Sequence, residues 1–227
     1  MHAFSVIFSA LPAMLEGCVV TLGIVFAALS IGLIFGLCFA IMQVYGNKWQ
    51  RYFVNVYIWF FRGFPILVLL FLGYGLFVTI GLPANPFLIS AVVLGCTSTA
   101  YQSQIFRGAM QSLRQGQLKA ARALGMRDSQ AIRYIIIPQA LRLSIPGWSN
   151  EYSILLKDSA ICFVLGTQDI MAKTSFAAAR THEHLALYAV AGLIYFLLTL
   201  IIVKLLSRLE QKLQIPGFTS ANEDNKL

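Results

Sequence analysis

The sequence predicts an all-α polytopic membrane protein, and three observations support this fold class. Of the 227 residues, 58% are hydrophobic and 11% are charged, whereas soluble globular chains carry about 45–50% and about 25%. Several apolar stretches reach the length of about 20 residues that a membrane-spanning helix needs. The formal net charge is +8, and the basic residues flank the apolar stretches, which favours membrane orientation over nucleic-acid binding. A soluble enzyme domain is disfavoured and a disordered chain is excluded.

Uncharged stretches and turn signals divide the chain into five predicted spans. Residues 17–47 carry no charge and predict the first span. Residues 63–106 are also uncharged but too long for one span, and the turn-rich string 81–86 divides them in two. The fourth span is apolar but contains Glu151, Lys157 and Asp158. The predicted spans lie at about residues 15–45, 57–80, 87–107, 141–166 and 185–206.

Basic residues indicate the direction in which the chain crosses the membrane. With the N-terminus outside, 14 of the 17 Lys and Arg residues face the cytoplasm, only Lys173 and Arg180 lie outside, and Lys157 lies within a span. Positively charged loops tend to stay in the cytoplasm, so we expect an external N-terminus and a cytoplasmic C-terminus. Residues 1–213 form the predicted membrane domain, and the polar residues 214–227 form a cytoplasmic tail.

The loop of about residues 114–138 is too patterned for a simple linker. Residues 117–124 predict a short helix. Gly125 comes directly after it, at the position where a residue in the left-handed conformation commonly ends a helix. Asp128 is a suitable cap for a second helix over about 129–136, which Pro138 should end, with Ile137 extended. On this pattern alone, two interpretations are equally supported: a bent pair of helices with a specific role, and an amphipathic segment that rests on anionic lipid.

The chain itself shows no source of energy, should this membrane protein be a transporter. The sequence has no G-x-x-x-x-G-K-S/T phosphate-binding loop, so a pump would need its ATPase on another polypeptide. Inverted halves typical of many secondary transporters are also missing, although an ion-coupled carrier stays an alternative. The four cysteines lie in apolar stretches without metal-binding spacing. We therefore expect no enzymatic activity, no metal site and no cofactor bound by this chain.

Residues 119–121 (K-A-A), Gly125 and residues 135–138 (I-I-I-P) resemble the loop signature of ATP-binding-cassette (ABC) importer permeases. In that signature, E-A-A precedes a glycine and an I-x-L-P string at these spacings. Lys119 replaces the glutamate and Ile137 replaces the leucine. Over about residues 11–213, the chain is similar to the polar amino acid uptake branch, with matching strings at 61–65 (F-R-G-F-P), 105–108 (I-F-R-G) and 156–159 (L-K-D-S).

The resemblance implies a permease subunit of an ATP-driven type I ABC importer in a bacterial inner membrane. It implies two cytosolic ABC ATPase subunits that bind ATP-Mg, and a second permease that is a copy or a related chain. An extracytoplasmic solute-binding protein would deliver a polar or basic amino acid. The loop would dock in a groove of the ATPase, and the expected coupling residues are Lys119, Ala120, Ala121, Gly125 and Pro138.

Polar residues within the predicted spans are candidates for a substrate path. An ionisable residue inside a span costs about 2.5–3.5 kcal/mol or more and usually faces a cavity or a partner. Glu151 and Asp158 are seven residues apart, nearly on one helix face, and Asn150 lies near that stripe. The stripe is suited to the α-ammonium of an amino acid or a cationic side chain; a structural ion pair or a contact between subunits is the alternative. Thr97 and Tyr101 of the third span are polar enough to line the path but equally suited to helix packing.

Overall fold

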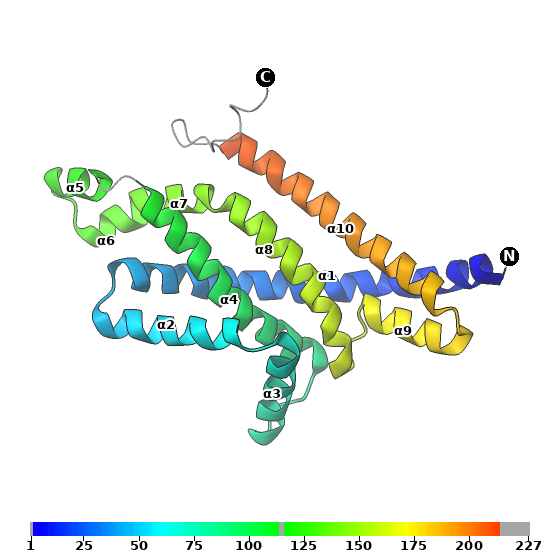
Figure 1. The fold of residues 1–227 in the computed structure, drawn as a ribbon. Helices are drawn as coiled ribbons and strands as arrows, with labels where there is room; N and C mark the ends of the chain where they lie inside the picture. Colours follow the sequence, from blue (N-terminus) through cyan, green and yellow to red (C-terminus); the bar gives the residue numbers. More distant parts are fainter. Residues whose placement is uncertain (1, 114–115, 214–227) are drawn as a thin grey trace.

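The all-α fold class predicted from the sequence is confirmed. In the computed structural model, the described residues, 2–113 and 116–213, form helices and connecting turns but no strand (Figure 1). A 44-residue helix, α1 (His2–Tyr45), extends across most of the molecule. Helix α4 (Pro86–Ser112) lies along it and makes the most extensive contact between any two helices. The predicted tail, residues 214–227, lies outside the described residues.

Glycines allow α1 and α4 to approach closely. Gly32 and Gly36 of α1 lie against Gln102 of α4, and a Cβ at Gly36 would lie 3.0 Å from the Gln102 Cβ. From the other side, Gly95 of α4 lies against Ile31, where a Cβ would lie 2.8–2.9 Å from three side-chain atoms. Close packing of small residues is a main source of helix association in membranes. This contact therefore fixes how the polar face of α4 meets the rest of the molecule.

The predicted span at about 57–80 is not one straight helix. Helices α2 (Lys48–Gly63) and α3 (Ile66–Thr79) are separate and meet at 110°. Phe64 between them is extended, with φ −96° and ψ 141°, as expected for a residue that precedes a proline. Pro65 has no N–H to continue the helix. The F-R-G-F-P segment therefore forms a sharp bend within the predicted span.

The predicted span at 141–166 consists of three consecutive helical pieces. These are α7 (Ile137–Leu143), α8 (Ile145–Asp158) and a 3₁₀-helix, η2 (Ser159–Leu165). Helix α9 (Ile170–Thr181), which the sequence analysis did not predict, follows at the end of the molecule that carries the N-terminus (Figure 1). The Asp169 side chain caps it by accepting a 2.8 Å hydrogen bond from the Ala172 N–H.

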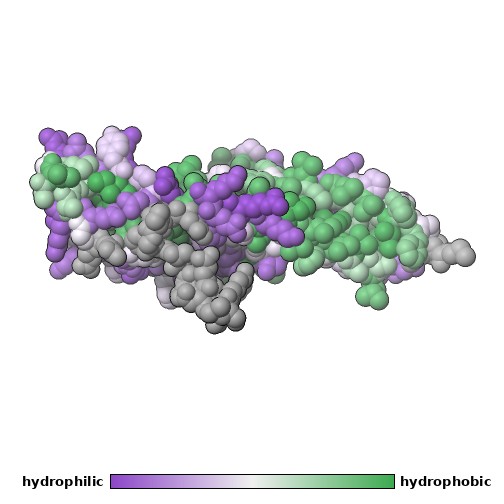
Figure 2. All heavy atoms as spheres, turned by 90° about the horizontal axis from the view of Figure 1, so that it is seen from above, coloured by the Kyte–Doolittle hydropathy of each residue, from purple (hydrophilic) through white to green (hydrophobic). Residues whose placement is uncertain are grey.

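Two of the described helices are long and apolar enough to cross a membrane by themselves. They are α1 and α10 (His184–Leu213), and the bent α2–α3 pair adds a third candidate. The predicted total of five spans therefore stays a prediction. The surface agrees with a membrane environment, since hydrophobic residues cover a long stretch of the molecule and hydrophilic residues gather toward the end that carries α5 and α6 (Figure 2).

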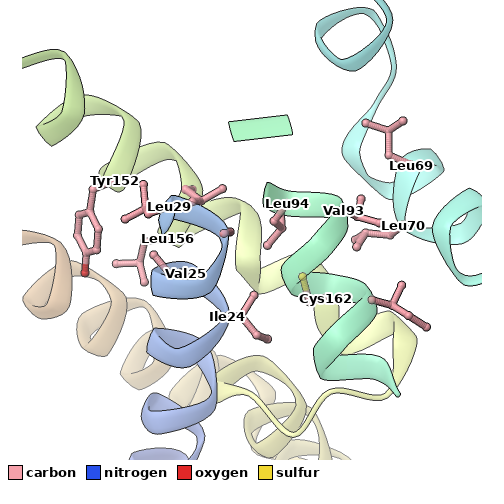
Figure 3. Close-up of a cluster of buried hydrophobic side chains, with 13 residues drawn as sticks. Ile24, Val25, Leu29, Leu69, Leu70, Val93, Leu94, Tyr152, Leu156 and Cys162 are labelled. Atoms are coloured by element: carbon pink, nitrogen blue, oxygen red, sulfur yellow. The ribbon is translucent and has the colours of Figure 1, made fainter. Parts of the chain in front are cut away.

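The central hydrophobic core holds these helices together. It draws buried side chains from α1, α3, α4, α8 and η2, and Figure 3 draws them as sticks with ten labelled. Two further clusters lie toward the two ends of α1. The central core comprises Ile24, Val25, Ala28, Leu29, Leu69, Leu70, Ile89, Val93, Leu94, Tyr152, Leu155, Leu156 and Cys162.

Candidate functional site

The loop between α4 and α8 begins with helix α5 (Gly116–Ala123) and a sharp turn. Gly125 has φ +79°, the left-handed conformation that a residue without Cβ adopts at little cost. Its N–H donates to the Arg122 carbonyl at 3.0 Å, and the Met126 N–H donates to the Ala121 carbonyl at 3.0 Å. These bonds satisfy the last carbonyls of α5. The predicted left-handed helix end at Gly125 is therefore confirmed.

Asp128 connects the two sides of this turn, and the prediction that it caps the second helix is wrong. It is the first residue of α6 (Asp128–Ala131), where Arg127 takes the cap position and its N–H donates to Gln130 Oε1 at 2.9 Å. The Arg122 guanidinium donates two hydrogen bonds to its carboxylate, at 2.7 and 2.8 Å. These bonds lower the pKa of Asp128 below its ordinary value. The exposed pair therefore pins α5 to α6 across Gly125.

Pro138 does not end the second helix, contrary to the prediction. The chain continues from α6 through a π-helical turn, η1 (Ile132–Ile136), into α7. Ile137 is helical, with φ −58° and ψ −48°, and its N–H donates to the carbonyl of Ile132, five residues back. Proline lacks an N–H and clashes with the carbonyl four residues back in a regular α-helix. The wider turn just before Pro138 relieves this conflict.

The loop is anchored to the transmembrane part by polar and apolar contacts. Gln117 and Gln139 exchange two amide hydrogen bonds, of 2.9 and 3.0 Å. Ile136 and Leu118 pack with the ends of α1 and α4. A cavity of about 470 Å³, lined partly by Lys119, lies between α5 and these ends. We call residues 116–131 the α5–α6 elbow. These contacts hold the elbow in a fixed position against α1, α4 and α7.

The expected coupling residues differ in exposure. Ala121 is 1% exposed and packs within the chain, whereas Lys119, Ala120, Gly125 and Pro138 are exposed. The small side chain of Ala121 is thus explained by internal packing. Ala120 has no such internal reason to be small and is available to another molecule.

A chain of buried hydrogen bonds lies between α1, α4 and α8. The Ser98 hydroxyl donates to Glu151 Oε1 at 2.6 Å, and Gln102 Nε2 donates to the Ser98 hydroxyl at 3.0 Å and to the Leu29 carbonyl at 3.1 Å. Trp148 Nε1 donates to Gln102 Oε1 at 2.7 Å. Glu151 is only 3% exposed. The predicted path did not include Ser98 or Trp148. The four-residue spacing of Ser98 and Gln102 on one face of α4 was the available signal.

The other predicted path residues take different positions. Asp158 is the last residue of α8 and partly buried, and Asn150 is exposed. The Thr97 hydroxyl donates to the Val93 carbonyl of its own helix at 3.1 Å, so it is already satisfied. The Arg62 guanidinium lies 4.8 Å from the centre of the Tyr101 ring, a cation–π contact.

Arg62 and Asp158 also interact electrostatically with Glu151. The bend between α2 and α3 thus brings Arg62 to the side of α4 that Tyr101 occupies. Within residues 2–113 and 116–213, no group of three or more His, Cys, Asp or Glu side chains is placed to hold a metal ion. The arrangement offers two carboxylates, one guanidinium and an aromatic ring, a set that suits a zwitterionic or charged small molecule.

Comparisons with known proteins agree with the resemblance found in the sequence. The family described as binding-protein-dependent transport system inner membrane component matches residues 28–215. The arginine transport system permease protein ArtQ of Bacillus subtilis is 34% identical over 212 residues, covering 93% of this chain and 97% of ArtQ. The glutamine transport system permease protein GlnP of Escherichia coli is 31% identical over 214 residues, covering 93% and 98%.

Solved structures give the same result. A crystal structure of an amino acid ABC transporter with histidines superposes with a TM-score of 0.81 at 34% identity, covering 91% of this chain and 96% of that one. The inward-facing MetNI methionine ABC transporter, at 18% identity and a TM-score of 0.79, shares the fold. The resemblance to amino acid ABC permeases is therefore confirmed, and the chain belongs to the family of inner membrane components of binding-protein-dependent transport systems.

Proposed function

We propose that this chain forms the translocation path of an ATP-driven amino acid importer and receives its power through the α5–α6 elbow. The observation that carries the proposal is the elbow itself, a bent pair of helices at the positions of the family's loop signature. The relatives named above as arginine and glutamine permeases support an amino acid as substrate. An ion-coupled carrier, the alternative, has no comparable observation in its favour.

The proposed assembly has two permeases, two ATPases and a receptor. Two cytosolic ABC ATPase subunits bind ATP-Mg and grip the elbows, and the second permease is a copy of this chain or a related one. A solute-binding protein delivers the amino acid on the external side of the membrane, where the N-terminus lies. The C-terminus lies on the opposite, cytoplasmic side. ATPase closure rocks the two permeases about a central path.

The elbow has the exposed features that docking requires. Leu124 is 82% exposed in the turn between α5 and α6, although an apolar side chain of this size gains from burial. Beside it, Ala120 and Gly125 are exposed and small, which lets another helix or groove approach closely. Lys119 has no acidic partner among the described residues, so we expect an acidic group on the ATPase surface that faces it.

The docking proposal is tested by filling the exposed small position. Ala120→Trp keeps the backbone of α5 but adds a large side chain where the ATPase should approach. We expect the permease to insert normally and substrate-stimulated ATP hydrolysis to be lost. Ala189→Trp, at an exposed alanine of the apolar helix α10, is the matched control and should hydrolyse ATP normally. Full stimulation in Ala120→Trp would refute docking at this face.

The substrate path is proposed along the polar side of α4 and α8. Asp158 and Glu151 attract the ammonium or the cationic side chain, with Tyr101 and Asn150 beside the path and Thr97 contributing little because its hydroxyl is satisfied. We expect Asp158→Asn to reduce uptake strongly, because a charge-assisted hydrogen bond contributes about 1.5–3 kcal/mol, or roughly 10- to 150-fold.

Glu151→Gln separates a path role from a structural one. The substitution keeps the size of the side chain and its hydrogen bond with Ser98 while removing the charge. Uptake assays with the cognate solute-binding protein and a set of amino acids measure both variants. Unchanged uptake in both would remove the two carboxylates from the path while leaving the elbow proposal intact.

A further inference from the structure

A polar pocket lies where the end of α1, the beginning of α2 and the second half of α4 meet. Its volume is about 250 Å³, room for about eight water molecules at about 30 Å³ each. We call it the Arg51–Arg107 pocket. The transport path and the elbow described above do not use it. Its lining residues are Gln43, Val44, Arg51, Asn55, Arg107 and Gln111.

The side chains around this pocket form a directed series of hydrogen bonds. Arg107 Nη1 donates to Gln104 Oε1 at 3.3 Å, and Gln104 Nε2 donates to Gln43 Oε1 at 2.8 Å. Gln43 Nε2 then donates to Asn55 Oδ1 at 2.8 Å. Each amide oxygen accepts from the group before it, so the series ends on the Asn55 amide nitrogen. Asn55, whose –NH₂ group stays a donor, is one of the residues that line the pocket.

The second arginine is held in place by backbone carbonyls. Arg51 Nε donates to the Gly46 carbonyl at 3.0 Å, and Arg51 Nη2 donates to the Val44 carbonyl at 3.2 Å. Its Nη1 makes no such bond and stays a free donor. This ties the start of α2 to the end of α1 and fixes the orientation of the guanidinium. A preoriented guanidinium loses less entropy when it binds an anion.

The pocket has donors and positive charge but no acidic residue. No Asp or Glu lines it, and within the described part of the chain the one ion pair is Arg122–Asp128, in the elbow. Two arginines and an asparagine therefore line one pocket that has no acidic counterion. Planar guanidinium groups match the geometry of phosphate oxygens and form strong charge-assisted hydrogen bonds with them.

The position of the pocket points to the source of the anion. Trp49 and Tyr52, on the first turns of α2, are 81% and 67% exposed, and such aromatic residues concentrate at membrane interfaces. This end of α2 lies at the same end of the molecule as α5 and α6 (Figure 1). We propose that the Arg51–Arg107 pocket binds the phosphate of a phospholipid headgroup in the cytoplasmic leaflet.

The test measures lipid binding rather than transport, so its failure would leave the proposed function untouched. The full-length chain is purified in detergent, stripped of lipid, and titrated separately with phosphatidylglycerol, diacylglycerol and inorganic phosphate while its melting temperature is followed. We expect phosphatidylglycerol to raise the melting temperature and the other two to have no effect. A rise with inorganic phosphate alone would support a phosphate site but overturn the lipid as its source.

Variants locate the effect in the pocket. The double variant Arg51→Gln/Arg107→Gln should need about 30-fold more phosphatidylglycerol, about 2 kcal/mol for the charge-assisted hydrogen bonds that the two guanidinium groups would give to one phosphate. The matched control Arg142→Gln/Arg208→Gln removes two exposed arginines elsewhere and should behave as the unaltered chain. Asn55→Leu keeps both charges and should weaken binding by about fivefold. An equal lipid requirement in the pocket variants and the control would overturn the proposal.

Discussion

Replacing Gly32 by alanine tests how the α1–α4 contact supports the buried hydrogen-bond chain. A Cβ at this position would lie 2.9 Å from both Gln102 Cδ and the Ser98 hydroxyl, and closer still to Gln102 Nε2. The Gln102 amide cannot simply rotate away, because it is fully buried and held by Trp148 and by the Leu29 carbonyl. The added methyl group must therefore displace the amide.

The expected magnitude follows from three contributions. Overpacking a filled interior costs about 1–3 kcal/mol. Displacing the two bonds that Gln102 Nε2 donates costs about 1 kcal/mol, since interhelical hydrogen bonds in membranes average about 0.6 kcal/mol each. Exchanging glycine for alanine inside a helix regains about 1 kcal/mol. The net loss is about 1–3 kcal/mol, and a loss of about 2 kcal/mol lowers the melting temperature of a chain of this size by about 4–8 °C.

Thermal unfolding of the purified protein measures this loss. Gly192→Ala in α10 is the matched control, because no atom lies within 4 Å of the added Cβ, and it should melt at the same temperature or higher. Uptake by reconstituted vesicles should also fall in Gly32→Ala, since the bond from Ser98 to Glu151 is disturbed. If Gly32→Ala and Gly192→Ala melted within about 1 °C of each other, the close contact would not have the role assigned to it.

Three further predictions concern other parts of the molecule. Gly125→Ala forces a Cβ into the left-handed conformation at φ +79°, a cost of about 1–2 kcal/mol, and should lower substrate-stimulated ATP hydrolysis; unchanged stimulation would contradict the elbow geometry. Because Arg122 depresses the pKa of Asp128, their pairing is fully present above the unfolded pKa of about 3.9 and is lost as the pH falls through the lower folded pKa. The backbone amides of the elbow should thus be equally protected from hydrogen exchange at pH 8 and pH 5, once the intrinsic exchange rate is corrected for. A loss of protection already at pH 5 would count against the pair. Gly17→Ala places a Cβ 2.8 Å from three backbone atoms of residues 169 and 170, so it should melt below Gly32→Ala, and a melting temperature like that of Gly192→Ala would refute this packing.

Local features of the fold could be predicted from the sequence. The helical class and the long helices α1 and α10 follow from uncharged stretches, because the length of an apolar stretch is a property of the chain itself. The left-handed Gly125 was also predictable, since its helix-ending pattern involves only neighbouring residues. The resemblance, which covers most of the chain, predicted the family.

The effect of two prolines on their helices could not be predicted, because it depends on how the surrounding backbone adapts to each proline. Pro65 was read as part of an apolar span, yet it and the extended Phe64 produce the 110° bend between α2 and α3. Pro138 was expected to stop a helix, but the preceding π-turn carries the helix through it. In both cases the proline restricts the backbone as expected, and the surrounding structure decides whether the helix breaks.

The candidate path could be predicted only in part, because its contacts join distant residues. Glu151 on α8 meets Ser98, 53 positions earlier in the chain, and the pairing exists only once α4 and α8 pack together. The same holds for Arg62 and Tyr101, which the α2–α3 bend brings into contact. Asn150 was placed near the acidic stripe, but it lies about 100° around the helix from Glu151 and is exposed.

The central claim is that an ATPase gripping the elbow powers transport through this chain. The most direct measurement is uptake by vesicles that contain the permease, with and without its ATPase subunits, in the presence of the solute-binding protein and labelled amino acid. We predict accumulation only when the ATPase and hydrolysable ATP are both present. Accumulation against a gradient by the permease alone, driven by an imposed ion gradient, would contradict the account.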